Sequence, residues 1–191
     1  GYIIVNDNQW LKAGEDVFYF RPGLRYIIAF LHIIFGKSSF AFKFLEIFSI
    51  IGISYLTFLI CIKLQISKFI SLSISFLLLI LFFGESFRWL IGRGLSEYYG
   101  TFFFYIFLFL IISNKKFNFL QFFLFLILAF LITWTREDKS VNLLATILLL
   151  NFYNYKDQNI FRYVFNFTKD NYKYILILGG TVILSYPIIF E

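Results

Sequence analysis

The sequence predicts an all-α protein, a polytopic bundle of transmembrane helices. Of its 191 residues, 60% are hydrophobic, and the mean hydropathy is +0.81. A soluble domain of this length cannot bury so much apolar surface, so lipid is expected to solvate part of it. The apolar residues also fall into six runs that short polar segments separate. The spans expected from these runs are 40–62, 69–84, 99–113, 117–134, 141–153 and 174–190.

Residues 1–39 are predicted to form an extracytoplasmic loop that carries an interfacial helix. Pro22 suits the start of a helix, since proline fits the first helical position. The apolar stretch 23–35 would reach only about 20 Å as a helix, less than the roughly 30 Å hydrocarbon core. It also contains Arg25. We therefore expect a helix that lies in the membrane interface and ends at Gly36.

The first expected span contains two charges near its start. Lys43 and Glu46 are spaced i,i+3 and share one helical face, so they can pair or snorkel to the interface. The chain begins at Gly1 without Met and ends at Glu191, in or just beyond an apolar run. We interpret it as a fragment of a longer membrane protein.

The polar segments differ in character on the two sides of the membrane. Both sides carry equal numbers of Lys and Arg, so the positive-inside rule does not orient the chain. One side has mainly lysines in short loops, which is typical of topology signals, and the other has mainly arginines beside acids, which is typical of sites. We predict that the lysine side is cytoplasmic and that the protein lies in a bacterial inner membrane. The arginine side comprises 1–39, 84–98 and 135–140, and the lysine side comprises 63–68, 114–116 and 154–173.

The first polar segment contains the candidate catalytic carboxylates. Glu15 and Asp16 stand just before an aromatic run, and Asp7 is a further candidate. Carboxylates at a membrane surface could act as a general base towards an acceptor hydroxyl, or hold a divalent cation. The alternative is a helix cap or a solvated acidic pair.

Arginines supply the candidate phosphate site. Gly92 and Gly94 flank Arg93, so backbone amides there can approach a ligand closely. Guanidinium and exposed N–H groups together suit phosphate. The alternatives are arginines that pair with lipid headgroups and charges that only mark the water boundary. The candidate phosphate-binding residues are Arg93, Arg136, Arg88 and Arg21, and the further site residues are Glu97, Glu137 and Asp138.

Several functional classes lack their motifs in this sequence. It has no P-loop, dinucleotide fingerprint, Ser/His/Asp pattern or metal-ligand spacing, so no organic cofactor is predicted, and a divalent cation held by the candidate carboxylates is the one metal considered. With one cysteine, Cys61, and one histidine, His32, a Cys/His cluster is excluded, and we expect His32 to be a satisfied interfacial residue. The polar residues within spans are mostly Ser and Thr, which argues against an ion pathway. No basic stretch is free of membrane segments, so nucleic acid is not an expected partner.

Three segments resemble a known family, the polytopic glycosyltransferases that use polyprenyl-phosphate sugars. These include the protein O-mannosyltransferases and the lipid A aminoarabinose transferases. The longer segment is FYFRPGLRYIIAFLHIIFGKSSFAFKFLEIFSIIGISYLTFLICIKL (18–64), with a Pro-containing turn, a Tyr-bearing short helix and "FG" before a span. TWTREDKSVNLL (133–144) is similar to a charged turn between later spans. Arg93 to Glu97 resemble the family's loop before its fourth span.

The resemblance implies a GT-C-type fold with a large first extracytoplasmic loop and an essential acid near the end of a preceding span. Asp7, Glu15 and Asp16 are the carboxylates here that could take that role, and Arg21-Pro22-Gly23 stands where the family usually has Pro-Pro. The implied activity is transfer of a sugar from a lipid-linked donor to a glycan, lipid or protein acceptor on the extracytoplasmic side, as part of cell-envelope assembly. The alternative is a non-catalytic flippase for lipid-linked glycans or a polymer-assembly protein.

Overall fold

The structure, a computed structural model, describes residues 22–36, 40–84, 97–113, 119–135, 139–146, 162, 169 and 172–184. Within these ranges all regular structure is helical and no strand occurs, which confirms the prediction of an all-α fold for this part of the chain. The principal helices are α2 (Pro22–Phe35), α3 (Phe40–Lys63), α4 (Lys68–Phe83), α6 (Glu97–Ser113) and α7 (Phe119–Thr135). Two further helices cover 139–146 and Tyr172–Leu184.

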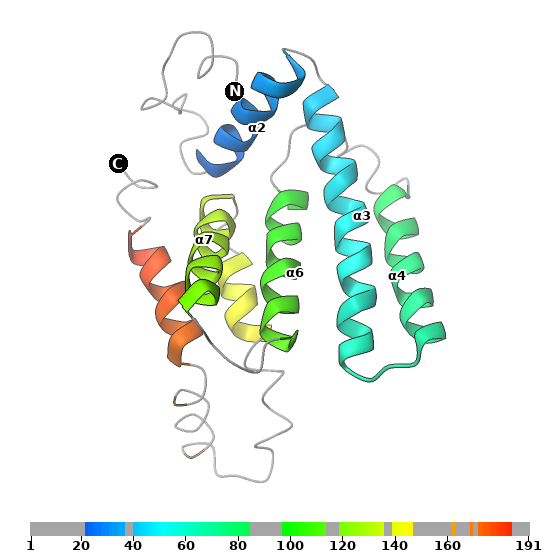
Figure 1. Cartoon of the computed structure of the whole chain (residues 1–191). Helices are drawn as coiled ribbons and strands as arrows, with labels where there is room; N and C mark the ends of the chain where they lie inside the picture. Colours follow the sequence, from blue (N-terminus) through cyan, green and yellow to red (C-terminus); the bar gives the residue numbers. More distant parts are fainter. Residues whose placement is uncertain are drawn as a thin grey trace.

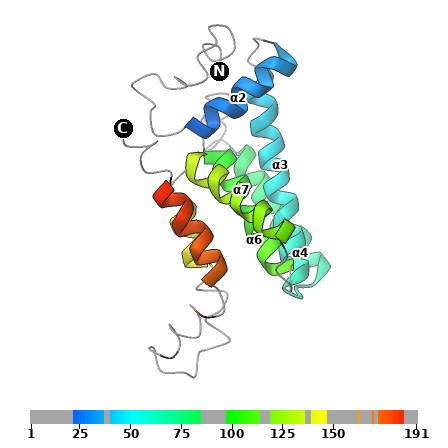
Figure 2. The ribbon, with the colours of Figure 1, turned by 60° about the vertical axis from the view of Figure 1, so that its left-hand side comes forward.

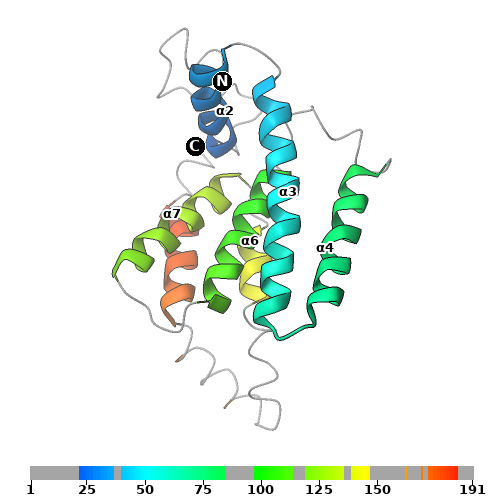
Figure 3. The ribbon, with the colours of Figure 1, turned by 45° about the vertical axis from the view of Figure 1, so that its right-hand side comes forward.

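The helices form a bundle with one helix across its end. α3, α4 and α6 run side by side, and α2 lies obliquely over the end of the bundle at which α3 and α6 begin (Figures 1 and 3). The turn from α3 to α4 lies at the opposite end (Figure 1). The helix Tyr172–Leu184 packs beside α7 (Figures 1 and 2). Helix ends therefore gather in two sets, one beneath α2 and one at the far end.

Local sequence sets the limits of α2. The helix begins at Pro22, whose fixed φ and missing N–H suit the first helical position. It ends at Gly36, which adopts a φ of +70°, the left-handed conformation that glycine reaches without steric cost. A Cβ added at Gly23 would lie 2.9 Å from Cβ of Trp134 and 3.1 Å from its carbonyl carbon. The absent side chain thus lets α2 pack tightly on the end of α7.

Hydroxyl groups join α3 to α4. Ser54 Oγ donates to the carbonyl oxygen of Ser75 at 2.7 Å, and Ser75 Oγ donates to the carbonyl oxygen of Ser54 at 2.7 Å. Both side chains are buried. Such reciprocal bonds between small residues let two helix backbones approach closely, as is common in helix pairs within membranes.

We expect Ser75→Ala to destabilise the protein by about 0.5–2 kcal/mol, because it removes one interhelical bond and leaves the Ser54 carbonyl without that donor. Thermal unfolding in detergent micelles measures this loss. Ser73→Ala is the matched control, since Ser73 Oγ donates only to the Phe69 carbonyl oxygen in its own helix. Equal losses in the two variants would show that the α3–α4 bonds contribute nothing specific.

Aromatic side chains fill the core between α6, α7 and the helix Tyr172–Leu184. The rings of Phe107 and Phe125 lie 4.8 Å apart edge to face, and the ring of Tyr174 lies 5.1 Å from that of Phe125. Phe107 and Phe125 are fully buried. Edge-to-face pairs at these distances add about 0.5–1.5 kcal/mol each beyond the apolar area they bury. This cluster therefore joins the consecutive helices α6 and α7 to the helix Tyr172–Leu184, which comes much later in the sequence.

The outer surface of the bundle is apolar. On α4, Phe69 is 80% exposed and Leu81 is 64% exposed, whereas Ser71 and Ser75 on the same helix are buried. Polar side chains thus face inwards and large apolar ones face outwards, the reverse of a helix at the surface of a soluble protein. Of the helices in the described ranges, α3 alone is long and apolar enough to cross a membrane, over Phe42–Lys63. α4, α6 and α7 are apolar but shorter.

Candidate functional site

One predicted site residue, Glu97, falls within the described residues. It is the first residue of α6, is partly buried, and has one carboxylate oxygen shielded from solvent. The proposed convergence of arginines with acids therefore stays a prediction. The predicted site residues outside the described ranges are Asp7, Glu15, Asp16, Arg21, Arg88, Arg93, Arg136, Glu137 and Asp138.

The structure instead draws attention to Glu46, whose side chain is 0% exposed. The i,i+3 spacing from Lys43 suggested that both charges share a surface, but Lys43 is exposed and Glu46 lies in the helix interface. The reason is that α6 packs against the face of α3 that carries Glu46. A buried carboxylate costs several kcal/mol unless other groups compensate its charge. Its surroundings are therefore the candidate site.

Two contacts set the register of α3 against α6. A Cβ added at Gly52 would lie 2.3 Å from the Phe102 ring, so the missing side chain admits that ring. The Phe48 ring also packs edge to face on Phe102, at 5.7 Å. Ser49 precedes Gly52 by three residues, as Tyr99 precedes Phe102, which is about one turn of each helix. Since α3 and α6 run in the same direction, Ser49 and Tyr99 lie at the same level of the interface.

Two tyrosines surround the Glu46 carboxylate. Tyr98 and Tyr99 are 2% and 1% exposed, and both lie within electrostatic range of Glu46, with Tyr99 the nearer. The Tyr99 hydroxyl is buried and lies close enough to the Glu46 carboxylate for a side-chain hydrogen bond. Ser49 Oγ is also buried, and it has no hydrogen-bond partner among the described residues. A buried hydroxyl without a partner is unusual, because nearly all such groups in folded proteins are paired.

His32 lies on α2, above the start of α3. Burial lowers the pKa of its imidazole below the usual value. Its ring packs edge to face on Phe42 at 5.7 Å. Nδ1 is buried and has no hydrogen-bond partner among the described residues, so the expectation of a satisfied histidine does not hold for this atom. A neutral imidazole against an aromatic ring indicates a packing role.

Chain connectivity relates this cluster to the predicted arginines. Gly84 follows the end of α4, Glu97 begins α6 and Thr135 ends α7. The end of α4, the start of α6 and the end of α7 lie at the end of the bundle where α2 is found (Figures 1 and 3). Residues 85–96 connect Gly84 to Glu97, and residue 136 follows Thr135 directly in the chain. Consecutive Cα atoms are about 3.8 Å apart. The segments with Arg88, Arg93 and Arg136 are thus tethered to the end of the bundle that holds Glu46.

Sequence reasoning missed Glu46 as a buried group, although a signal was present. Glu46, Ser49 and Gly52 follow one another at i+3 within an apolar run, so a charge and two small residues share one face. Small residues on one face are typical of close helix packing. Within the described residues no group of three or more His, Cys, Asp or Glu side chains could hold a metal ion. The predicted divalent-cation site would therefore need residues outside these ranges.

No protein-family model, no curated protein and no solved structure matches the chain.

Proposed function

We propose that the chain is part of an integral membrane glycosyltransferase that transfers a sugar from a polyprenyl-phosphate donor to an acceptor at the extracytoplasmic surface. One observation carries the proposal. The bundle has an apolar outer surface, and at one end it gathers a buried carboxylate, two tyrosines and the tethers of the arginine-bearing segments. Such an arrangement suits a substrate with an apolar tail and a charged head.

The apolar outer surface supports placement in a membrane. α3 is long enough to span the bilayer, and α4 pairs with it through Ser54 and Ser75 while it directs large apolar side chains outwards. Helices of 16 or 17 residues, such as α4, α6 and α7, extend for about 25 Å. Local thinning of the bilayer accommodates that length at a modest cost. The oblique α2 would then lie at the membrane surface.

The proposed reaction is a displacement at the anomeric carbon of the donor sugar. The acceptor hydroxyl oxygen forms a bond to this carbon as the bond to the phosphate oxygen breaks, and polyprenyl phosphate leaves with the bonding electrons. Asp16 or Glu15 takes the acceptor's proton. Negative charge increases on the leaving phosphate, and Arg93 and Arg136 stabilise it through charge-assisted hydrogen bonds.

A lipid-linked donor fits this protein better than a soluble one. The donor's phosphate would lie at the level of the membrane surface, and Arg93 and Arg136 are tethered at one end of the bundle. The tail would stay in the bilayer against the apolar outer surface. A flippase or polymer-assembly protein would need the same phosphate contacts but no base. Measured sugar transfer distinguishes these functions.

We expect Arg93→Lys and Arg136→Lys each to lower turnover by about 5- to 150-fold, equivalent to about 1–3 kcal/mol of transition-state stabilisation. Lysine keeps the charge but loses the planar fork that binds two phosphate oxygens. The assay is sugar transfer from polyprenyl-phosphate donors by the full-length protein in liposomes.

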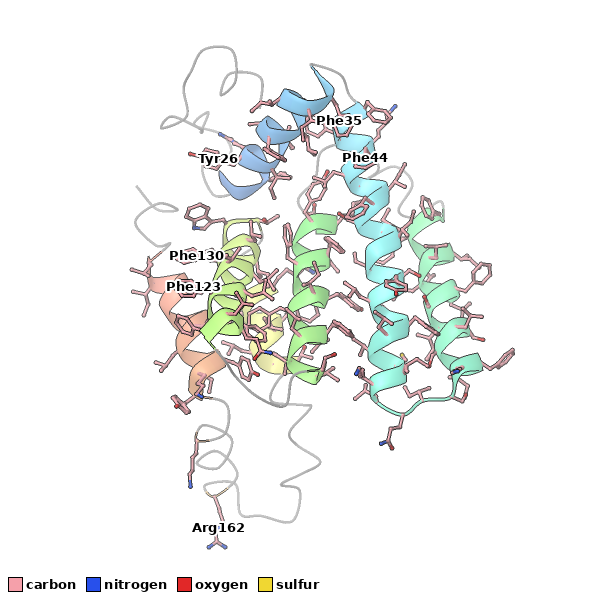
Figure 4. All side chains as sticks on the ribbon, in the orientation of Figure 1. Tyr26, Phe35, Phe44, Phe123, Phe130 and Arg162 are labelled. Atoms are coloured by element: carbon pink, nitrogen blue, oxygen red, sulfur yellow. The ribbon has the colours of Figure 1, made fainter. Side chains whose placement is uncertain are left out.

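Arg162→Lys is the matched control, because Arg162 is exposed at the end of the chain's fold opposite α2, which Tyr26 marks (Figure 4). Its turnover should equal that of the wild type. Unchanged turnover in both Arg93→Lys and Arg136→Lys would remove the phosphate-binding role. Absence of transfer in the wild type, with donor binding intact, would favour the flippase.

A further inference from the structure

We propose that the turn between α3 and α4 binds the headgroup of an anionic phospholipid, with Lys63 and Lys68 as its cations and the outward face of α4 against its acyl chains. The turn lies at the end of the bundle opposite α2 (Figure 1). This inference goes beyond the proposed sugar transfer and uses none of the residues assigned to it. The two proposals share only the placement of the bundle in a membrane.

Backbone hydrogen bonds fix the shape of this turn. Ile66 donates its N–H to the Cys61 carbonyl oxygen at 3.0 Å. Gln65 adopts a φ of +63° and donates its N–H to the Ile62 carbonyl oxygen at 3.1 Å. Together these two bonds form the Schellman motif, in which a left-handed residue ends a helix. The turn therefore holds the backbones of the two lysines, the last residue of α3 and the first of α4, in a set relation.

Both lysines are placed to meet a headgroup. Their side chains are exposed, and the segment 63–68 contains no acid. Lys63 also ends the stretch Phe42–Lys63, which is long and apolar enough to cross a membrane, so in a bilayer it lies at the level of the headgroups. Lysines at this level extend towards the lipid phosphates and are attracted to anionic lipids. A phosphatidylcholine headgroup has no net charge and gains less from this attraction.

The sequence around this turn has an excess of positive charge. The segments predicted on the lysine side contain eight Lys and Arg residues and two acids, whereas those predicted on the arginine side contain eight and seven. Equal numbers of cations on the two sides thus conceal unequal net charges. The lysine side is the more positive one and favours an anionic partner.

An apolar stripe on α4 begins directly after Lys68. Phe69, Leu72 and Phe76 are each at least 60% exposed. Their spacing of three and four residues puts them on one face of the helix. Cations at the head of an exposed apolar stripe match a phospholipid, whose phosphate meets the turn while its acyl chains follow the helix. A nucleic acid or an acidic protein would use the charges but not the stripe.

Native mass spectrometry tests the site on the full-length protein, in detergent micelles that contain equal amounts of phosphatidylglycerol and phosphatidylcholine. The wild type should retain phosphatidylglycerol at least tenfold more than phosphatidylcholine. Lys63→Gln and Lys68→Gln should each reduce this preference about fivefold. Leu72→Ser should weaken the retention of both lipids equally, because the stripe contacts acyl chains and not headgroups.

Lys43→Gln is the matched control, since Lys43 is also exposed on α3 but lies near its other end. It should keep the wild-type preference. Equal retention of the two lipids by the wild type would overturn the proposal, as would an unchanged preference in both Lys63→Gln and Lys68→Gln. Displacement of phosphatidylglycerol by polyglutamate would also overturn it and assign the surface to an acidic polymer.

A second measurement needs no variant and therefore decides even if a substitution prevents folding. A phosphatidylglycerol with a photoreactive group in its headgroup is crosslinked to the wild-type protein in the same micelles. Crosslinks within 63–70 are expected. Crosslinks confined to other segments would overturn the site.

Discussion

Gly52→Val is expected to destabilise the protein by about 1–3 kcal/mol, the usual cost of overpacking a close contact. A Cβ at this position would lie 2.3 Å from the Phe102 ring, well inside van der Waals contact. The ring cannot move freely, since it packs on Phe48 at 5.7 Å and on Phe103 at 5.9 Å. α3 and α6 would therefore separate.

Thermal unfolding can follow this loss through the thiol of Cys61, which is buried on α3 and reacts with a fluorescent maleimide when the helices part. Gly179→Ala is the control, because no atom lies within 4 Å of a Cβ added there, and alanine favours a helix over glycine. Combining Gly52→Val with Phe102→Ala should restore part of the lost stability, since the ring that clashes is gone. An equally unstable double variant would show that the clash is not the cause.

The helices could be predicted because their limits depend on local chemistry. Pro22 and Gly36 mark the ends of α2 through their own backbone preferences, and α3 follows from an unbroken apolar run. The packing could not be predicted in this way. Gly23 and Gly52 look alike in the sequence, yet one receives Trp134 and the other Phe102, and only the arrangement of helices decides which.

The site was harder to predict than the helices, because a charged residue near a helix end can either face the surface or be buried against another helix. Lys43 and Glu46 share a predicted helical face, and from their hydropathy alone both are expected at the surface. Burial of Glu46 depends on α6, which begins more than fifty residues later and brings Tyr98 and Tyr99 to the carboxylate. The predicted catalytic carboxylates in 1–21 lie outside the described residues, so their role stays a prediction.

The buried carboxylate changes one argument made from the sequence. The polar residues within the predicted spans are mostly Ser and Thr, which argued against an ion pathway, and Glu46 is a charge within such a span that the fold fully encloses. The fold places Tyr98 and Tyr99 beside this carboxylate, so α6 supplies polar neighbours for a charge that the sequence alone left without them.

Asp16→Asn is expected to lower sugar transfer by about 10²- to 10⁴-fold while donor binding stays within about threefold of the wild type. The amide keeps the size of the carboxylate but cannot take the proton of the acceptor hydroxyl, so only the chemical step suffers. Single-turnover transfer and equilibrium binding of the polyprenyl-phosphate donor, both with the full-length protein in liposomes, separate the two quantities. Glu15→Gln, measured in parallel, identifies which of the adjacent acids is the base.

Asp157→Asn is the control for this experiment, because Asp157 belongs to the polar segment predicted on the opposite side of the membrane. It should leave transfer unchanged. A cap or metal-positioning residue would retain part of its activity as the amide, since an amide oxygen still accepts a hydrogen bond or ligates a cation. Transfer by Asp16→Asn above about a tenth of the wild-type rate would therefore exclude Asp16 as the base. If Glu15→Gln kept the same activity, the essential carboxylate would have to lie elsewhere, with Asp7 the remaining candidate in this polar segment.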